Sequence, residues 1–230
     1  MTRSSEAVVT LSALDAATAA LVRQSARITA ASEAEVRAGF AECNSAGVSQ
    51  QWQEELVLQS YLFAGFPRAL NAAREWRKSQ EAGAGRIGGS AERSAVPLFA
   101  SRANEGYADV FDWRTRGEAT CATVYGEFYE KLRGNIRELS ASLDEWMIVE
   151  GYGKVLSRDG LDLGRRELCV VAACAAAGQE RQLHSHLHGA LNAGVAGGVV
   201  RAGLETLGGV VSGEMLERGR LLLGRIVGRG

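Results

Sequence analysis

The sequence predicts an all-α fold built from two diverged copies of one helical unit. Apolar residues recur at helical spacing along most of the chain, and the composition holds only two prolines among its 230 residues. A stretch close to the N-terminus also recurs close to the C-terminus, which is typical of an internal repeat. A chain of this length can bury a sizeable hydrophobic core.

Composition and charge exclude several classes of function. The formal net charge is −1, so no strong field favours binding to nucleic acid or to an anionic membrane. The first residues hold no long apolar stretch typical of a secretory signal. Charged or polar residues interrupt every apolar run before it reaches membrane-spanning length. We therefore expect a cytoplasmic protein with neither nucleic acid nor membrane as a partner.

The first 80 residues carry the first, degenerate repeat. Residues 11–45 read as one or two helices, with Gly47 as the stop. A further helix is expected over Gln51–Ala64, after which Gly65-Phe66-Pro67 breaks the chain. Pro67 suits the first turn of a helix, so the next helix is expected over Arg68–Gln80.

Residues 81–105 differ in composition, because glycine, serine and alanine dominate there. A segment of this kind indicates a long loop or linker, and a loop of that length is usually functional or mobile. We accordingly divide the chain into a first repeat (residues 1–80), a linker (81–117) and a second repeat (118–230).

The second repeat begins with a helix expected over Glu118–Leu139 and a short one over Ser142–Glu150, with Gly151-Tyr152-Gly153 as an interruption. A strongly apolar helix then follows. The remaining helices are expected over Leu163–Ala177, ended by Gly178; over Arg181–Asn192, closed by Gly194; and over about Gly203–Val227.

The repeat is visible when the chain is shifted by 147 residues. This shift aligns Leu14–Ser49 with Leu161–Ala196 without a gap, and nine of the 36 pairs are identical. Both ends of the match and the break between its two helices coincide. We interpret the match as two copies of a helix–turn–helix unit.

Two residues of the second copy could perform acid–base chemistry. Glu167 opens an apolar helix, and His186 falls on the apolar face of the next helix. If the two helices form a hairpin about Gly178, these side chains lie at similar distances from the bend. A buried carboxyl beside a buried imidazole is suited to proton transfer near neutral pH. The aligned residues of the first copy are Ala20 and Gly39, so only the second copy can hold this pair.

Other polar residues favour less specialised roles. His184 and His188 are expected to face solvent, and no further ligand cluster supports a metal site around them. The four cysteines form no CxxC pair, which indicates buried thiols in a reducing compartment. The simplest alternatives for the candidate pair are a glutamate that complements the helix dipole and a histidine satisfied in the core.

The sequence resembles the carboxymuconolactone decarboxylase family. The resemblance rests on four runs of the second half: Gly151 to Arg158, Leu161-Asp-Leu163, Arg166-Glu-Leu-Cys169, and Gln182-Leu-His-Ser-His-Leu-His-Gly-Ala-Leu-Asn-Ala-Gly194. In the first half, Glu55-Leu-Val-Leu-Gln59 and Ala64-Gly-Phe-Pro-Arg-Ala-Leu-Asn71 resemble the closing part of the same repeat. The resemblance implies an alkylhydroperoxidase D-like helical bundle in a tandem two-repeat member.

The decarboxylase branch of the family implies loss of carbon dioxide from a small carboxylated lactone, such as γ-carboxymuconolactone, in aromatic-compound catabolism. Such a reaction needs no cofactor and no metal, but it does need a proton donor for the resulting enolate. By this resemblance Glu167 and His186 become the catalytic pair. Arg158 or Arg166 could hold a substrate carboxylate, and Tyr125 and Tyr129 could line a pocket. The resemblance also implies a homotrimer or homohexamer.

Two alternatives stay open. A thiol peroxidase of the same superfamily is disfavoured, because Gln179 and Gln182 stand where paired cysteines would fall. A differently specialised relative, such as an isomerase, a small-acid binder or a non-catalytic assembly protein, is favoured by the loss of both polar residues from the first copy.

Overall fold

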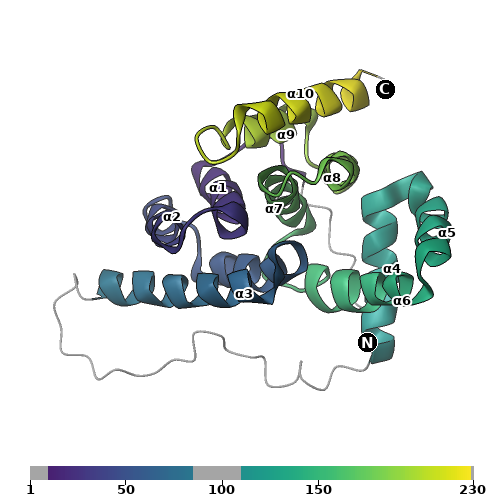
Figure 1. Cartoon of the computed structure of the whole chain (residues 1–230), viewed down its shortest axis with the longest axis horizontal. Helices are drawn as coiled ribbons and strands as arrows, with labels where there is room; N and C mark the ends of the chain where they lie inside the picture. Colours follow the sequence, from purple (N-terminus) through teal and green to yellow (C-terminus); the bar gives the residue numbers. More distant parts are fainter. Residues whose placement is uncertain (1–9, 85–109, 229–230) are drawn as a thin grey trace.

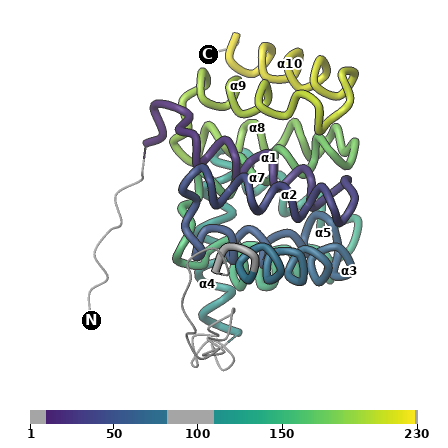
Figure 2. The backbone as a smooth tube through the Cα atoms, turned by 90° about the vertical axis from the view of Figure 1, so that its left-hand side faces the viewer, coloured from purple at the N-terminus to yellow at the C-terminus, as the bar shows by residue number. Residues whose placement is uncertain are grey.

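A computed structural model describes residues 10–84 and 110–228. Within these ranges the chain is helical throughout, with two isolated β-bridges and no sheet, so the predicted all-α class is confirmed. Seen from the side, the helices stack from α9 and α10 at one end, past α8, α7, α1 and α2, to α3 (Figure 2). None of the described helices combines the length and the apolar character needed to span a membrane.

Two helical hairpins form the centre of the fold. The first consists of α1 (Ala16–Ala30) and α2 (Glu33–Ser45), and the second of α7 (Leu163–Ala176) and α8 (Glu180–Asn192). Helix α1 packs against α7, so the two hairpins meet across the core (Figure 1). The apolar run of α7 predicts this position, since it is buried on nearly every face.

The bounds of the two hairpins repeat at the same shift of 147 residues that aligns the sequences. Asp15 and Asp162 are the N-caps of α1 and α7, and each accepts a hydrogen bond from the backbone N–H three residues later. Gly47 and Gly194 end α2 and α8 with positive φ angles of 77° and 88°. The hairpins thus share bounds and caps, while their origin as tandem repeats stays a prediction.

Helix α3 (Gln50–Ala84) is long and bent in its middle. Gly65 adopts φ 81° and ψ 159°, a conformation that interrupts the helix and that glycine tolerates without strain. Pro67 follows in the first turn of the second half, as the sequence predicts. The first half of α3 packs on α7 and the second half on the hairpin of α1 and α2.

A layer of α4 (Val110–Tyr125), η2 (Gly126–Phe128), α5 (Tyr129–Leu139), α6 (Ala141–Trp146) and the π-helix η3 (Met147–Leu156) covers one side of α8 (Figure 1). Two predictions for this layer are wrong. The helix expected over Glu118–Leu139 is broken at Gly126, which has a φ of 53°. Gly151-Tyr152-Gly153 does not interrupt the chain, because the π-helix runs through it.

The last part of the chain also departs from the prediction of one helix over Gly203–Val227. Helix α9 (Gly197–Glu205) ends before Gly208 and Gly209, and Ser212 caps α10 (Gly213–Val227). The predicted linker over 81–117 is too long as well. Helix α3 extends to Ala84 and α4 begins at Val110, so both ends of that segment are helical, whereas the rest of it lies outside the described residues.

Candidate functional site

The candidate site lies where α7 and α8 face each other. Nδ1 of His186 lies 2.8 Å from Oε2 of Glu167, which is hydrogen-bonding distance. The glutamate is fully buried and the histidine is 3% exposed. Oε1 of Glu167 has no hydrogen-bond partner among the described residues. The structure therefore joins the two residues that the sequence singles out, and it leaves one buried carboxylate oxygen able to accept another donor.

Gly189 allows this pair to form. A Cβ atom at position 189 would overlap Oε2 of Glu167 and a methyl carbon of Val124. Only glycine lets α8 approach the carboxylate and α4 at the same point. The close approach of α8 at Gly189 brings the helix that carries His186 against the Glu167 carboxylate.

Two aromatic side chains lie against the histidine and a third packs on one of them, and they come from three different elements. The rings of Phe63 in α3 and Tyr125 in α4 lie edge-on to the imidazole, with centroid distances of 5.7 Å and 6.5 Å. The ring of Tyr152 in η3 lies 6.1 Å from that of Tyr125. Burial, and to a lesser degree the charge of Glu167, raise the pKa of both tyrosines, so both hydroxyls stay protonated at neutral pH.

The two arginines that the sequence offers for a substrate carboxylate, Arg158 and Arg166, both contact another carboxylate. Arg166 is fully buried, and its guanidinium donates to Oε2 of Glu55 at 2.8 Å. Arg158 donates to both oxygens of the same carboxylate, at 3.0 Å and 3.3 Å. The structure thus pairs both arginines with Glu55 in α3, while their role toward a substrate carboxylate stays a prediction.

A comparison with known protein families matches part of the chain. The family model described as "Carboxymuconolactone decarboxylase family" matches residues 145–203. We refer to these matched residues as the carboxymuconolactone decarboxylase segment. No curated protein matches the chain. The carboxymuconolactone decarboxylase segment spans η3, α7, α8 and most of α9, and it includes Glu167 and His186. The all-α fold of the described residues is consistent with the alkylhydroperoxidase D-like bundle that the resemblance implies.

Tyr129 precedes the carboxymuconolactone decarboxylase segment, and its hydroxyl contacts an arginine of its own helix α5. It accepts a hydrogen bond from Nη1 of Arg133 at 2.8 Å. Arg133 in turn makes a nearly buried ion pair with Asp144, so this group joins α5 to α6. The structure places Tyr129 in this clip, whereas Tyr125 lies beside the histidine.

The remaining histidines of the carboxymuconolactone decarboxylase segment lie on the outer side of α8. The rings of His184 and His188 are 5.0 Å apart, and the Phe128 ring packs against His188. In residues 10–84 and 110–228, no group of three or more His, Cys, Asp or Glu side chains could hold a metal ion.

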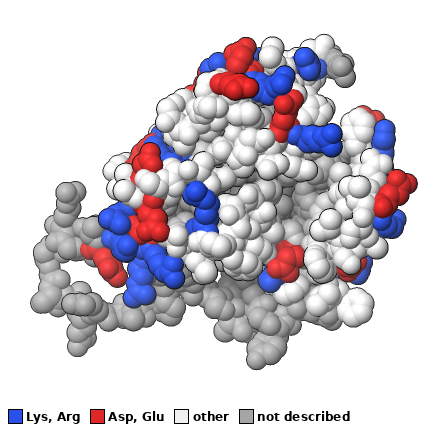
Figure 3. Space-filling view, in the orientation of Figure 1, with Lys and Arg blue, Asp and Glu red and all other residues white. Residues whose placement is uncertain are grey.

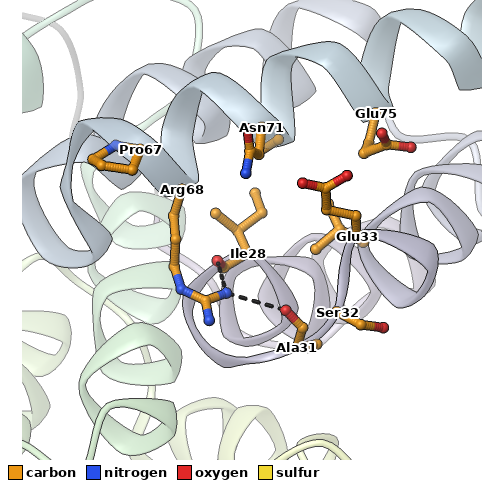
Figure 4. Close-up of a pocket in the computed structure, with 10 residues that line it drawn as sticks. Ile28, Ala31, Ser32, Glu33, Pro67, Arg68, Asn71 and Glu75 are labelled. Carbon is orange, nitrogen blue, oxygen red and sulfur yellow. Dashed lines mark hydrogen bonds between the residues drawn. The ribbon is translucent and has the colours of Figure 1, made fainter.

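Two surface pockets border the α1–α2 hairpin, and neither is lined by Glu167 or His186. A pocket of about 320 Å³ lies between the tip of the α1–α2 hairpin and the second half of α3 (Figure 4). Arg68 occupies its edge and donates to the carbonyl oxygens of Ile28 and Ala31, which ends α1. Charges of both signs stand side by side over α10, α2 and α3 (Figure 3), in keeping with the small net charge.

Several residues of the site are not evident from the sequence. Phe63 and Glu55 belong to the first half of the chain, far from the carboxymuconolactone decarboxylase segment. Tyr152 lies between two glycines that predict an interruption of the helix. The sequence also does not indicate that a Cβ atom at Gly189 would overlap Glu167. A repeat alignment alone cannot show that α3 closes the site of the other half.

Proposed function

We propose that this protein is a cofactor-free carboxy-lyase that removes carbon dioxide from a small carboxylated lactone such as γ-carboxymuconolactone. The observation that carries the proposal is the buried hydrogen bond between Glu167 and His186 within the carboxymuconolactone decarboxylase segment. A carboxyl and an imidazole in contact, both removed from water, are suited to general acid–base catalysis. The aromatic side chains around His186 supply the apolar surroundings that such a substrate ring requires.

In the proposed reaction, the bond between the ring carbon and the carboxylate breaks, and carbon dioxide leaves. The electron pair of that bond passes through the unsaturated lactone to its carbonyl oxygen, and an extended enolate forms. His186, held through Nδ1 by Glu167, gives a proton from Nε2 to carbon and is reprotonated from water. Among the described residues Nε2 has no hydrogen-bond partner, so this nitrogen is available for the step.

A thiol peroxidase is a poorer match to the same site. All four cysteines are buried thiols, and burial raises the pKa of Cys43, Cys121 and Cys174 to about 12. Burial raises the pKa of Cys169 as well. A thiol that stays protonated at neutral pH is a weak nucleophile toward peroxide.

The first test measures carbon dioxide release from γ-carboxymuconolactone by the wild type and by two variants of the dyad. Glu167→Gln keeps the shape of the side chain, and His186→Asn keeps a group able to bond Glu167 while removing Nε2. We expect each variant to lose at least about a hundredfold in kcat with little change in thermal stability. His188→Asn, on the same helix, serves as the matched control and should retain wild-type kcat.

An absence of carbon dioxide release by the wild type at any protein concentration would refute the decarboxylase proposal. Retention of kcat by both dyad variants would show instead that the pair is structural.

One observation favours a second candidate, a non-catalytic or differently specialised relative. Arg158 and Arg166 both make ion pairs with Glu55, so neither carries a positive charge that is uncompensated before a substrate carboxylate arrives. Thermal-shift titration with small lactone acids separates the two candidates. A relative that only binds will gain stability with such acids and release no carbon dioxide from any of them.

A further inference from the structure

The dyad of Glu167 and His186 is almost completely closed off from solvent. The glutamate is fully buried and the histidine is 3% exposed. The carboxylate occupies Nδ1 of the imidazole, so chemistry on a dissolved molecule has to take place at the rest of the ring. A molecule from solution reaches that ring only when one of the side chains that cover it moves aside.

Two aromatic side chains, Phe63 and Tyr125, lie against the imidazole, and both are themselves partly exposed. The Phe63 ring is the nearer one, with a centroid distance of 5.7 Å against 6.5 Å, and it stands at 89° to the imidazole. A ring that contacts a nearly buried group and also reaches solvent lies between the two. Phe63 and Tyr125 are therefore the candidates for the side chain that moves.

Tyr125 is held against the helix that carries His186. Nδ2 of Asn192 in α8 donates to the carbonyl oxygen of Val124, the residue before Tyr125, at 2.9 Å. The ring of Tyr152, which is 4% exposed, lies 6.1 Å from the Tyr125 ring and crosses it at 75°. Tyr125 therefore belongs to the fixed wall of the site.

Phe63 reaches the imidazole from a face of α3 whose earlier residues are bound to α7. Glu55, Gln59 and Phe63 follow one another at a spacing of four residues and therefore share one face of the helix. Arg166 in α7 donates to Oε2 of Glu55 at 2.8 Å, and its carbonyl oxygen accepts from Nε2 of Gln59 at 3.3 Å. These contacts fix the first half of α3 on α7 and bring Phe63 to the dyad.

The helix is bound less completely at Phe63 than at Glu55 and Gln59. In a regular helix the carbonyl oxygen of Phe63 would accept from the N–H of residue 67, but Pro67 has no N–H. Gly65 leaves the helical conformation between them, with φ 81° and ψ 159°. Phe63 thus lies in the last turn of the first half of α3, and helices open most readily at such ends.

We propose that Phe63 controls the access of small molecules to His186, closing the site with its ring and opening it when that ring rotates away from the imidazole. The movement needs only a change of side-chain rotamer, because the contacts of Glu55 and Gln59 hold the backbone of α3 in place. This role does not depend on which reaction the dyad performs. On the proposed function, on which this last point rests, Phe63 also limits the size of the lactone that reaches His186.

Diethyl pyrocarbonate, which acylates the unprotonated imidazole nitrogen of an accessible histidine, is the probe for this proposal. Mass spectrometry follows its reaction with each of the three histidines separately, in the wild type and in Phe63→Ala. His184, exposed on α8, is the internal reference. Rates taken from about pH 6 to about pH 8.5 separate two effects, because the charge of the imidazole sets the midpoint of the profile and access sets its plateau.

In the wild type we expect the plateau rate of His186 to be at least about tenfold below that of His184. Phe63→Ala should raise the His186 rate at least about tenfold and leave the His184 rate unchanged. Phe63→Leu, which keeps an apolar side chain and more of the packing, should raise it about threefold. Phe66→Ala is the matched control, because the Phe66 ring is 62% exposed and stacks on Tyr61, and it should leave the His186 rate at its wild-type value.

Alkylation of Cys43 by iodoacetamide shows whether a variant opens locally or loosens the whole core. Cys43 is fully buried in α2, so it reacts only when the core itself becomes accessible. We expect it to stay as slow in Phe63→Ala and Phe63→Leu as in the wild type. A His186 plateau that neither variant raises, or one that rises only together with Cys43 alkylation, would overturn the proposal.

The access role and the decarboxylase proposal can fail separately. If Phe63→Ala exposes His186 as expected but the wild type releases no carbon dioxide, the decarboxylase proposal falls and the role of Phe63 stands. If the wild type decarboxylates its substrate and the His186 plateau is the same with and without the Phe63 ring, the role of Phe63 falls alone.

Discussion

At the scale of single residues, Gly189 determines whether the carboxylate and the imidazole can meet. The position is fully enclosed by Glu167 and Val124, so even one methyl group must displace one of them. The cost of such overpacking is typically about 1–3 kcal/mol. The chemistry of the dyad should be even more sensitive, since a small shift of the carboxylate changes its hydrogen bond to His186.

We therefore expect Gly189→Ala to lower the melting temperature and to abolish most carbon dioxide release. Gly134→Ala in α5 is the control, because a Cβ atom there meets nothing within 4 Å. It should stabilise the protein by about 0.5–1 kcal/mol through helix propensity. Thermal unfolding measures whether Gly189→Ala lowers the melting temperature and Gly134→Ala raises it. A Gly189→Ala protein as stable and active as the wild type would contradict the close contact.

The reactivity of the four buried thiols tests the peroxidase alternative. Burial holds the pKa of Cys43, Cys121 and Cys174 near 12, so almost no thiolate exists at neutral pH. We expect native protein at pH 8 to resist alkylation by iodoacetamide over minutes, whereas unfolded protein reacts at all four positions. Mass spectrometry counts the modified thiols. Rapid modification of two thiols in the native protein would revive the dithiol mechanism.

At the scale of elements, the sequence predicts regular helices better than it predicts their interruptions. The hairpin of α7 and α8 agrees with its prediction almost to the residue, because aspartate, glycine and an apolar run mark its ends. The π-helix η3 was missed, since glycines at 151 and 153 are ordinary breakers in isolation. Gly153 is needed for a contact with α4, and that contact is visible only in three dimensions.

The crossing of α4 and η3 yields a prediction at this scale. Gly153→Ala should separate the two elements, and the cost should exceed about 2 kcal/mol because backbone atoms, which cannot rotate away, surround the site. Gly151→Ala, two residues earlier in the same element, meets nothing within 4 Å and is the control. Urea unfolding gives both free energies, and equal stability of the two variants would contradict the close crossing.

The clip between α5 and α6 predicts a dependence on pH. The hydrogen bond from Arg133 holds the pKa of Asp144 below its usual value of 3.8. A folded-state pKa below the unfolded one means that the clip stabilises the protein above about pH 4, and that this stability is lost as the pH falls further. Asp144→Asn should be less stable than the wild type at pH 7, and the difference should shrink in acid. A constant difference from pH 7 to pH 3 would contradict this linkage.

At the scale of the whole molecule, one carboxylate connects the two halves of the chain. Glu55 in α3 is nearly buried and receives Arg166 from α7 and Arg158 from the turn before it. Removal of one partner from a buried ion pair leaves an uncompensated charge and costs about 3–5 kcal/mol. Glu55→Gln should therefore destabilise the protein strongly, as measured by urea unfolding. Glu81→Gln, in an exposed pair with Arg77, should have little effect.

This network also contains a contact of the arginines that the sequence does not indicate. Arg158 and Arg166 lie next to Glu167 along the chain, and arginine is a common ligand of carboxylates. Their partner comes from more than a hundred residues earlier in the chain, and nothing in a single sequence indicates that pairing. The dyad could be predicted because both its members lie in one hairpin, where the register of two helices fixes their distance.

The bent helix α3 has a consequence for how this protein can be divided. Its first half supplies Phe63 to the ring around His186 and Glu55 to the arginines, although it lies outside the segment that carries the family signature. The segment that the family model matches is therefore shorter than the part of the chain that is needed to form the site. Two separately expressed pieces, residues 1–84 and 110–230, should regain the site only when mixed, much as the subunits of an obligate heterodimer depend on each other.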